Sequence, residues 1–195
     1  MHKQGVNAPS ESSAPDSELL LRSRTDADAF SLIYQRHSVA VHMFLARRLG
    51  RDAANDLLSE VFLRALEARH RTRPHESGSA LPWLYGIARN MVRTHVRASK
   101  VRPIDDPSPP FDWGAVDSRL DADAMSAELR IAIGALTDLE REVLLLVSWE
   151  QLPIGEVAAV LGISANAARQ RLHRARARAA AALAAVTHPF QNQEN

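Results

Sequence analysis

Arginine, glutamine and histidine side chains recur three and four residues apart near the C-terminal end of the sequence. Between Ser164 and Arg178 there are five arginines and no acidic residue. Burying such charges without partners would cost on the order of several kcal/mol each. We therefore expect an exposed helical face that offers arginine and glutamine to phosphates and base edges in a DNA major groove. The polar residues that share this face are Asn166, Arg169, Gln170, His173 and Arg174.

A second basic stripe lies in the middle of the chain, at steps of four, four and three residues. Such a helical face suits contact with phosphates, and the polar loop 70–80 before it could receive unstacked bases. Trp83 lies on the opposite side, where a place in the core is favoured over a role in base stacking. Asn90 lies beside the stripe itself, which consists of Arg89, Arg93, Arg97 and Lys100.

A third surface has the opposite charge. Asp52, Asp56 and Glu60 step by four residues along a predicted helix, whereas Leu57 and Phe62 lie on its other sides. Taken alone, these acids form an ordinary solvated face. Beside two basic blocks, the same face could instead dock a protein partner, and the residues by themselves leave both interpretations open.

The C-terminal basic face needs a helix-turn-helix to position it. A short amphipathic helix is predicted over 153–161, and a longer helix begins at residue 165. Gly162 permits a left-handed turn between them, Ile163 fills the corner and Ser164 caps the second helix. The second helix should pack inward through its small and apolar positions, namely Ala168, Leu172, Ala175 and Ala179.

The whole chain is predicted to be all-α, with two small helical domains joined by a flexible linker. We expect a flexible arm over 1–17, a first domain over 18–102 and a linker over 103–120. The helix-turn-helix domain follows over 121–186, with a flexible tail over 187–195. Residues 103–128 hold four prolines, seven acids and one arginine, which is typical of a solvated tether. Thr137 and Glu140 have the spacing of a capping box and predict a helix start inside the second domain.

Composition excludes several classes of protein. The chain has 195 residues, a net charge of +1 and no cysteine, so disulfides and thiolate chemistry are absent. No apolar run is long enough for a membrane span, and the first 18 residues lack the apolar segment of a signal peptide. The eight histidines have no metal-binding spacing, and no phosphate-binding glycine loop occurs. We expect a cytoplasmic protein with no catalytic residues, bound metal or cofactor.

Four segments, in this order, resemble bacterial RNA polymerase sigma factors of the extracytoplasmic-function group. Residues 28–37 resemble the first helix of that family, and 53–65 resemble its polymerase-docking helix. Residues 82–90 resemble its promoter-melting helix, and 139–178 resemble its C-terminal helix-turn-helix. The four segments cover about 18–100 and 121–183 together, and the combination is far more specific than any one of them.

The resemblance implies core RNA polymerase and promoter DNA as partners, together with an anti-sigma inhibitor. It assigns Asp56, Leu57, Glu60 and Phe62 to polymerase binding. The −10 element would be opened and held by Trp83, Arg89, Asn90, Arg93 and Arg97. The recognition helix would read the −35 element, with Arg171 and Arg176 on phosphates beside the base-reading residues named above. The alternative is a stand-alone helix-turn-helix regulator, which would explain the C-terminal domain but not the segments at 53–65 and 82–90.

Overall fold

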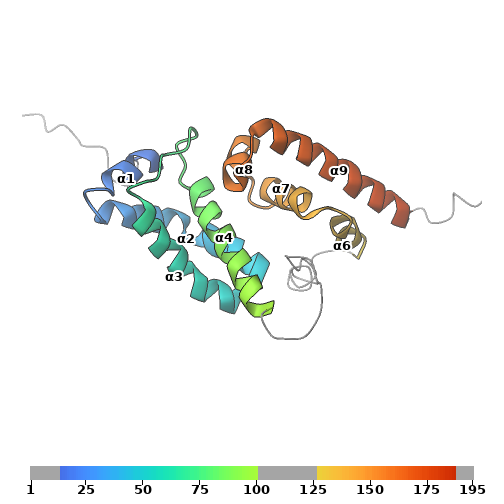
Figure 1. Cartoon of the computed structure of the whole chain (residues 1–195), viewed down its shortest axis with the longest axis horizontal. Helices are drawn as coiled ribbons and strands as arrows, with labels where there is room; N and C mark the ends of the chain where they lie inside the picture. Colours follow the sequence, from blue (N-terminus) through green and yellow to red (C-terminus); the bar gives the residue numbers. More distant parts are fainter. Residues whose placement is uncertain (1–13, 101–126, 188–195) are drawn as a thin grey trace, which may run out of the picture.

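A computed structural model gives the arrangement of residues 14–100 and 127–187. Within these two ranges the chain forms eight helices and no strand, so the predicted all-α class is confirmed. Figure 1 shows the helices in two groups, α1–α4 and α6–α9. The predicted linker over 103–120, most of the N-terminal arm and nearly all of the tail lie outside the described residues.

The first group is a bundle built around three long helices. Gly50 separates the first two of these helices. It has a φ of 85°, a backbone conformation that glycine adopts without steric cost. Phe44, Val61 and Leu84 come from the three different helices and are at most 1% exposed, so they form the centre of the bundle. The helices are α2 (Asp28–Leu49), α3 (Arg51–Ala68) and α4 (Leu81–Lys100).

The first helix differs from the prediction. Helix α1 (Asp16–Arg22) begins inside the segment expected to be a flexible arm. Leu19 and Leu20 are 0% and 2% exposed and join the core of the bundle. Asp16 is also buried and accepts hydrogen bonds from two side chains of α2 and from the backbone just before α4. The ordered structure therefore starts before residue 18. The residues that contact α1 lie far away in the sequence, so the local pattern did not reveal it.

The second group contains the predicted helix-turn-helix and the two helices before it. The capping box is confirmed, because the Glu140 carboxylate accepts hydrogen bonds from the backbone N–H and the hydroxyl of Thr137. The buried Arg141 donates to the carbonyls of Ile133 and Leu136, which fixes the turn between the first two helices of this group. The four helices are α6 (Ala127–Gly134), α7 (Asp138–Ser148), α8 (Ile154–Leu161) and α9 (Ala165–Thr187).

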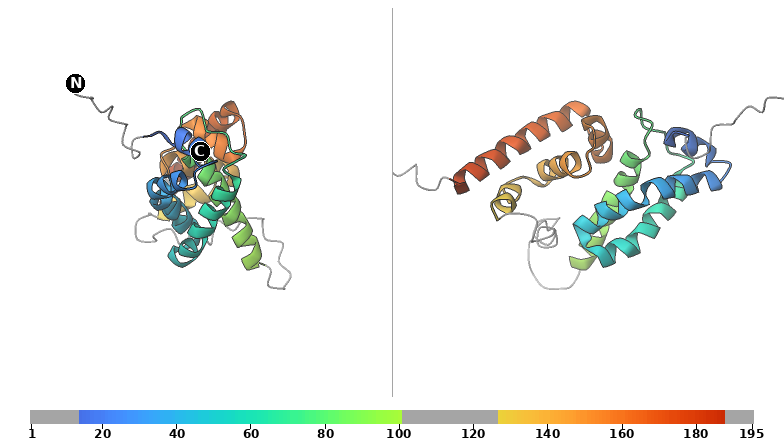
Figure 2. Two further views of the ribbon diagram at one scale, coloured as in Figure 1. Left: turned by 90° about the vertical axis from the view of Figure 1, so that its left-hand side faces the viewer. Right: turned by 180° about the vertical axis from the view of Figure 1, so that it is seen from behind.

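The two groups pack against each other rather than lying apart on a tether. Helix α4 contacts α8, and the right-hand view in Figure 2 shows the two groups side by side. Leu152, Val157 and Val160 from the second group belong to the same apolar cluster as the core of the first. The contact between the groups therefore includes buried apolar side chains, which favours a closed arrangement in water.

Candidate nucleic-acid interface

The turn between α8 and α9 has the predicted chemistry. Gly162 adopts a left-handed conformation with a φ of 65° and ends α8. The N–H of Ile163 returns to the carbonyl oxygen of Ala158 at 3.0 Å. Ser164 then caps α9, because its hydroxyl oxygen accepts the N–H of Ala167 at 3.1 Å. Local sequence signals thus set the angle at which α9 leaves the turn.

Helix α9 presents the predicted polar face to solvent. Ala168 and Ala175 are fully buried, so the inward-facing side is also as predicted. Arg171 differs from its neighbours, because it is half-buried and its Nη1 atom is covered without a hydrogen-bond partner. The exposed polar residues of α9 are Asn166, Arg169, Gln170, His173, Arg174, Arg176 and Arg178.

Glu140 anchors the middle of α9 to the start of α7. Its carboxylate accepts a hydrogen bond from Arg178 at 2.7 Å, and Arg174 lies 3.7 Å from its other oxygen. Burial by itself would raise the pKa of Glu140, but the hydrogen bonds from Thr137 and the positive charge of Arg178 outweigh burial and lower it. The carboxylate is therefore ionised at neutral pH, and it holds α9 in place while leaving Arg174 half exposed.

The basic stripe on α4 is only partly open to solvent. Asn90, Arg93 and Arg97 are exposed. Arg89 instead forms a two-point ion pair with Glu142 of α7, in which its Nε and Nη2 atoms donate to the two carboxylate oxygens, Nη2 at 2.9 Å. The side chains of Arg89 and Glu142 are only 14% and 13% exposed. The closed arrangement thus covers one of the cations predicted to hold DNA. Trp83 is half-buried and packs on the core cluster.

A second acid extends the ionic contact between the groups. Glu150, between α7 and α8, accepts hydrogen bonds from Arg47 at 2.7 Å and from Arg48 at 3.1 Å. Arg48 also lies 3.5 Å above the ring of Phe44, and Phe44 stacks on Tyr85. Burial, together with the nearby Glu150 carboxylate, raises the pKa of Tyr85. Burial lowers the pKa of Arg48, although Glu150 opposes that change.

The acidic face on α3 is accessible to solvent, but one of the residues assigned to polymerase binding is buried. Asp56 is exposed, Leu57 is half-buried, and the side chain of Glu60 is 45% exposed while it pairs with Arg64. Phe62 is buried at 5% exposure, with its ring against Phe30 and Tyr34. Direct contact between Phe62 and a partner is therefore excluded in this arrangement. An apolar residue is needed at position 62 because its side chain packs in the core.

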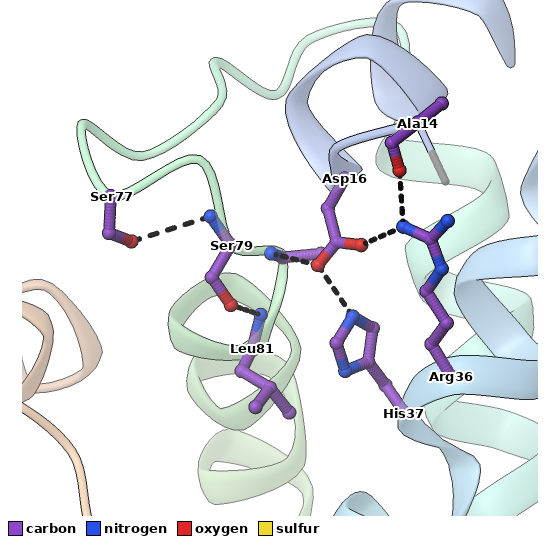
Figure 3. A network of polar contacts seen from close by, with 8 residues as sticks. Ala14, Asp16, Arg36, His37, Ser77, Ser79 and Leu81 are labelled. Atoms are coloured by element: carbon purple, nitrogen blue, oxygen red, sulfur yellow. Dashed lines mark hydrogen bonds and ion pairs between the residues drawn. The ribbon is translucent and has the colours of Figure 1, made fainter. Parts of the chain in front are cut away.

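Sequence reasoning missed a polar network that joins α1, α2 and the loop before α4. Asp16 lies at its centre and accepts from Arg36, His37 and the backbone N–H of Ala80, as Figure 3 shows. It also missed the role of Glu142 and Glu150 as partners of the first group. These contacts join residues 20 to 103 positions apart, and no local spacing marks them.

The described residues hold no sign of a metal site or a membrane span. No group of three or more His, Asp or Glu side chains within 14–100 and 127–187 could hold a metal ion. In the same ranges, no helix is both long enough and apolar enough to cross a membrane.

Comparison with known families gives two matches that coincide with the two groups of helices. Residues 33–102 match the model for sigma-70 region 2. Residues 126–178 match the model for sigma-70 region 4. The first match includes α4 with its basic stripe, and the second includes the turn and most of α9.

Curated sigma factors align with most of this chain. The sigma factor CarQ of Myxococcus xanthus is 34% identical over 75% of this chain and 84% of its own length. The ECF sigma factor BldN of Streptomyces coelicolor is 33% identical over 86% of this chain. The chain spans 66% of BldN and 35% of the sigma factor RfaY of Xanthomonas campestris.

A solved structure supports the arrangement of helices. CnrH, determined in complex with the cytosolic domain of CnrY, is 27% identical and covers 87% of this chain and 97% of its own, with a TM-score of 0.59. The likeness therefore includes both groups of helices. The chain belongs to the bacterial RNA polymerase sigma factors, and within them to the extracytoplasmic-function group.

Proposed function

We propose that this chain binds core RNA polymerase, directs it to a class of promoters and helps to open them. The single observation that carries the proposal is the exposed arginine-rich face of α9, held by a complete helix-turn-helix in a chain with both sigma regions. Arginine on such a face gains its counter-charge from DNA phosphates and guanine edges. A stand-alone regulator would not need the region 2 helices, so the sigma factor function is favoured.

The recognition helix is proposed to read the −35 element. Arg169, Gln170 and Arg174 are exposed on one face and are long enough to reach base edges in a major groove. Asn166 and His173 flank them, and Arg176 would contact a phosphate. Arg171 is proposed to contact a phosphate only after its half-buried side chain turns outward, since its Nη1 atom is covered.

The −10 element is proposed to bind α4 and the loop before it. Asn90, Arg93 and Arg97 are already exposed and would hold the backbone of the melted strand. Arg89 must first leave Glu142, and α8 must move away from α4. The closed arrangement is therefore proposed for the free chain, and polymerase binding would supply the energy that separates the two groups. Trp83 would support the loop from the edge of the core.

Core polymerase is proposed to dock on the acidic face of α3. Asp56 and Glu60 would pair with basic residues of the polymerase, and Leu57 would add an apolar contact. Phe62 supports this face from beneath. An anti-sigma inhibitor is a further proposed partner, in keeping with the protein complex in which CnrH was solved. A cytoplasmic location is proposed because core polymerase and promoter DNA are found there.

Binding to purified core polymerase tests the docking proposal. The double variant Asp56→Asn, Glu60→Gln should weaken binding about tenfold or more, because two charge-assisted contacts are lost. Glu18→Gln is the control, since it removes one carboxylate from an exposed position on α1, outside the acidic face. Equal affinity of the double variant and the control would refute the assignment of this face.

A further inference from the structure

The loop between α3 and α4 is held at both ends by the N-terminal segment around α1. We propose that α1 and the turn after it position this loop for base capture, with Asp16 as the principal positioning residue. The inference rests on the proposed function, because it concerns the loop assigned to the −10 element. Helix α1 lies outside the region 2 match, which begins at residue 33. The match itself therefore assigns no role to α1.

At the end of the loop, the contact is made by the Asp16 carboxylate. Its Oδ2 atom accepts the backbone N–H of Ala80 at 2.9 Å and His37 Nε2 at 2.6 Å. Its Oδ1 atom accepts Arg36 Nη1 at 2.9 Å. In Figure 3 the carboxylate lies between α2 and the last residues of the loop, directly before the first turn of α4. One side chain thus joins three elements at the point where the loop becomes a helix.

Backbone contacts reinforce this end. The N–H of Ser17 donates to the carbonyl oxygen of Gly78 at 3.0 Å. Gly78 itself has a φ of 75°, which favours glycine at this position of the loop. Two consecutive residues of α1 therefore fix two nearby positions of the loop, one through a side chain and one through the backbone.

The beginning of the loop is held by residues that follow α1. Arg24 Nη2 donates to the carbonyl oxygen of Thr72 at 2.7 Å. Arg69 Nε donates to the carbonyl oxygen of Ser23 at 2.7 Å. Between the two fixed ends, the exposed Ser77 bonds to His75 within the loop. The same short segment thus sets the distance between the ends and leaves the centre of the loop facing solvent.

The apolar and the polar contacts of α1 have different targets, which indicates a role beyond attaching α1 to the bundle. Leu19 and Leu20 already attach α1 to the core. The polar contacts are directed instead at the loop and at the helix that follows it. A loop that is ordered before binding loses less conformational entropy when it takes up a base. The low pKa of Asp16, about 2, agrees with a carboxylate that stays ionised among its donors.

The test compares Asp16→Asn with the control Glu18→Gln in the full chain. Hydrogen exchange would follow the amides of 72–80, and 2-aminopurine in the −10 non-template strand would report base unstacking with core polymerase. The promoter would be one selected by run-off transcription with the wild-type chain. We expect faster exchange in the loop and about tenfold weaker unstacking in Asp16→Asn, with polymerase affinity unchanged.

Two results would overturn the inference. One is normal base unstacking by Asp16→Asn despite a loosened loop. The other is a parallel loss of polymerase affinity, which would mean that Asp16 only maintains the bundle. If Asp16→Asn does not fold, Arg24→Gln loosens the other end and should reproduce the loss of unstacking; normal unstacking by a folded Arg24→Gln would equally refute the inference. Failure of the wild-type chain to open any promoter would instead refute the proposed function.

Discussion

Replacement of Glu142 by Gln should shift the free chain from the closed towards a separated arrangement. The Arg89–Glu142 pair makes two hydrogen bonds in an environment where each side chain is less than 15% exposed. A hydrogen bond to a charged group stabilises a folded arrangement by about 1.5–3 kcal/mol. The neutral amide keeps the shape of the carboxylate, so part of the contact remains. We expect a loss of about 2 kcal/mol, or roughly 30-fold in the equilibrium between the two arrangements.

The assay takes advantage of the absence of cysteine from the chain. Cysteines introduced at the exposed Ser59 of α3 and Ala180 of α9 would carry a donor and an acceptor dye. Glu142→Gln should lower the energy transfer between them. It should also raise the affinity of the free chain for single-stranded −10 DNA, because Arg89 becomes available. Asp138→Asn is the matched control, since it removes a similar charge from an exposed position on the same helix.

Unchanged energy transfer in Glu142→Gln, relative to Asp138→Asn, would show that the Arg89–Glu142 pair does not hold the two groups together. The apolar contact around Leu152 and the ion pairs of Glu150 with Arg47 and Arg48 would then be enough to hold the two groups together. Reduced energy transfer without any gain in DNA affinity would show that Arg89 does not limit binding to the −10 strand.

Three further predictions concern the recognition helix, acid stability and backbone geometry. Arg174→Ala should weaken −35-dependent transcription by about 1–3 kcal/mol at particular bases, and an equal response of every −35 variant would contradict base reading. The pKa of Asp16 is lowered from 3.8 to about 2, so the stability it contributes is present above pH 4 and disappears as the pH falls from about 4 to 2. In urea unfolding, the difference between the wild type and Asp16→Asn should shrink over that range, and a constant difference would contradict the assignment. Gly155→Ala should raise the free energy of unfolding by up to about 1 kcal/mol, because its site is open, whereas Gly162→Ala should lower it by a similar amount, because φ is 65° there. Thermal unfolding would measure both changes in stability. A change of the same sign in the two variants would contradict the different backbone conformations of Gly155 and Gly162.

The helix-turn-helix could be predicted from the sequence because its signals are local. The left-handed glycine at 162, the cap at Ser164 and the capping box at Thr137 each act within a few residues, and the structure has all three. The buried alanines and exposed arginines of α9 follow from the helical period in the same way.

The closed arrangement could not be predicted in this way. Arg89 fits a basic stripe by its spacing, yet its partner is 53 positions away on another helix. Phe62 occupies an apolar position next to an acidic face, and spacing alone does not distinguish an exposed anchor from a core residue. Asp16 lies in a segment with no apolar period before it, so its role depends on contacts with Ala80 and His37 that only the folded chain creates.

Run-off transcription with purified core polymerase on a library of genomic fragments tests the sigma factor function most directly. The wild-type chain should start transcription from a defined set of promoters with shared −35 and −10 elements, whereas core polymerase alone should not. The free chain should bind those promoters weakly. Tight binding to duplex DNA without polymerase, together with no specific transcripts in its presence, would contradict the sigma factor function.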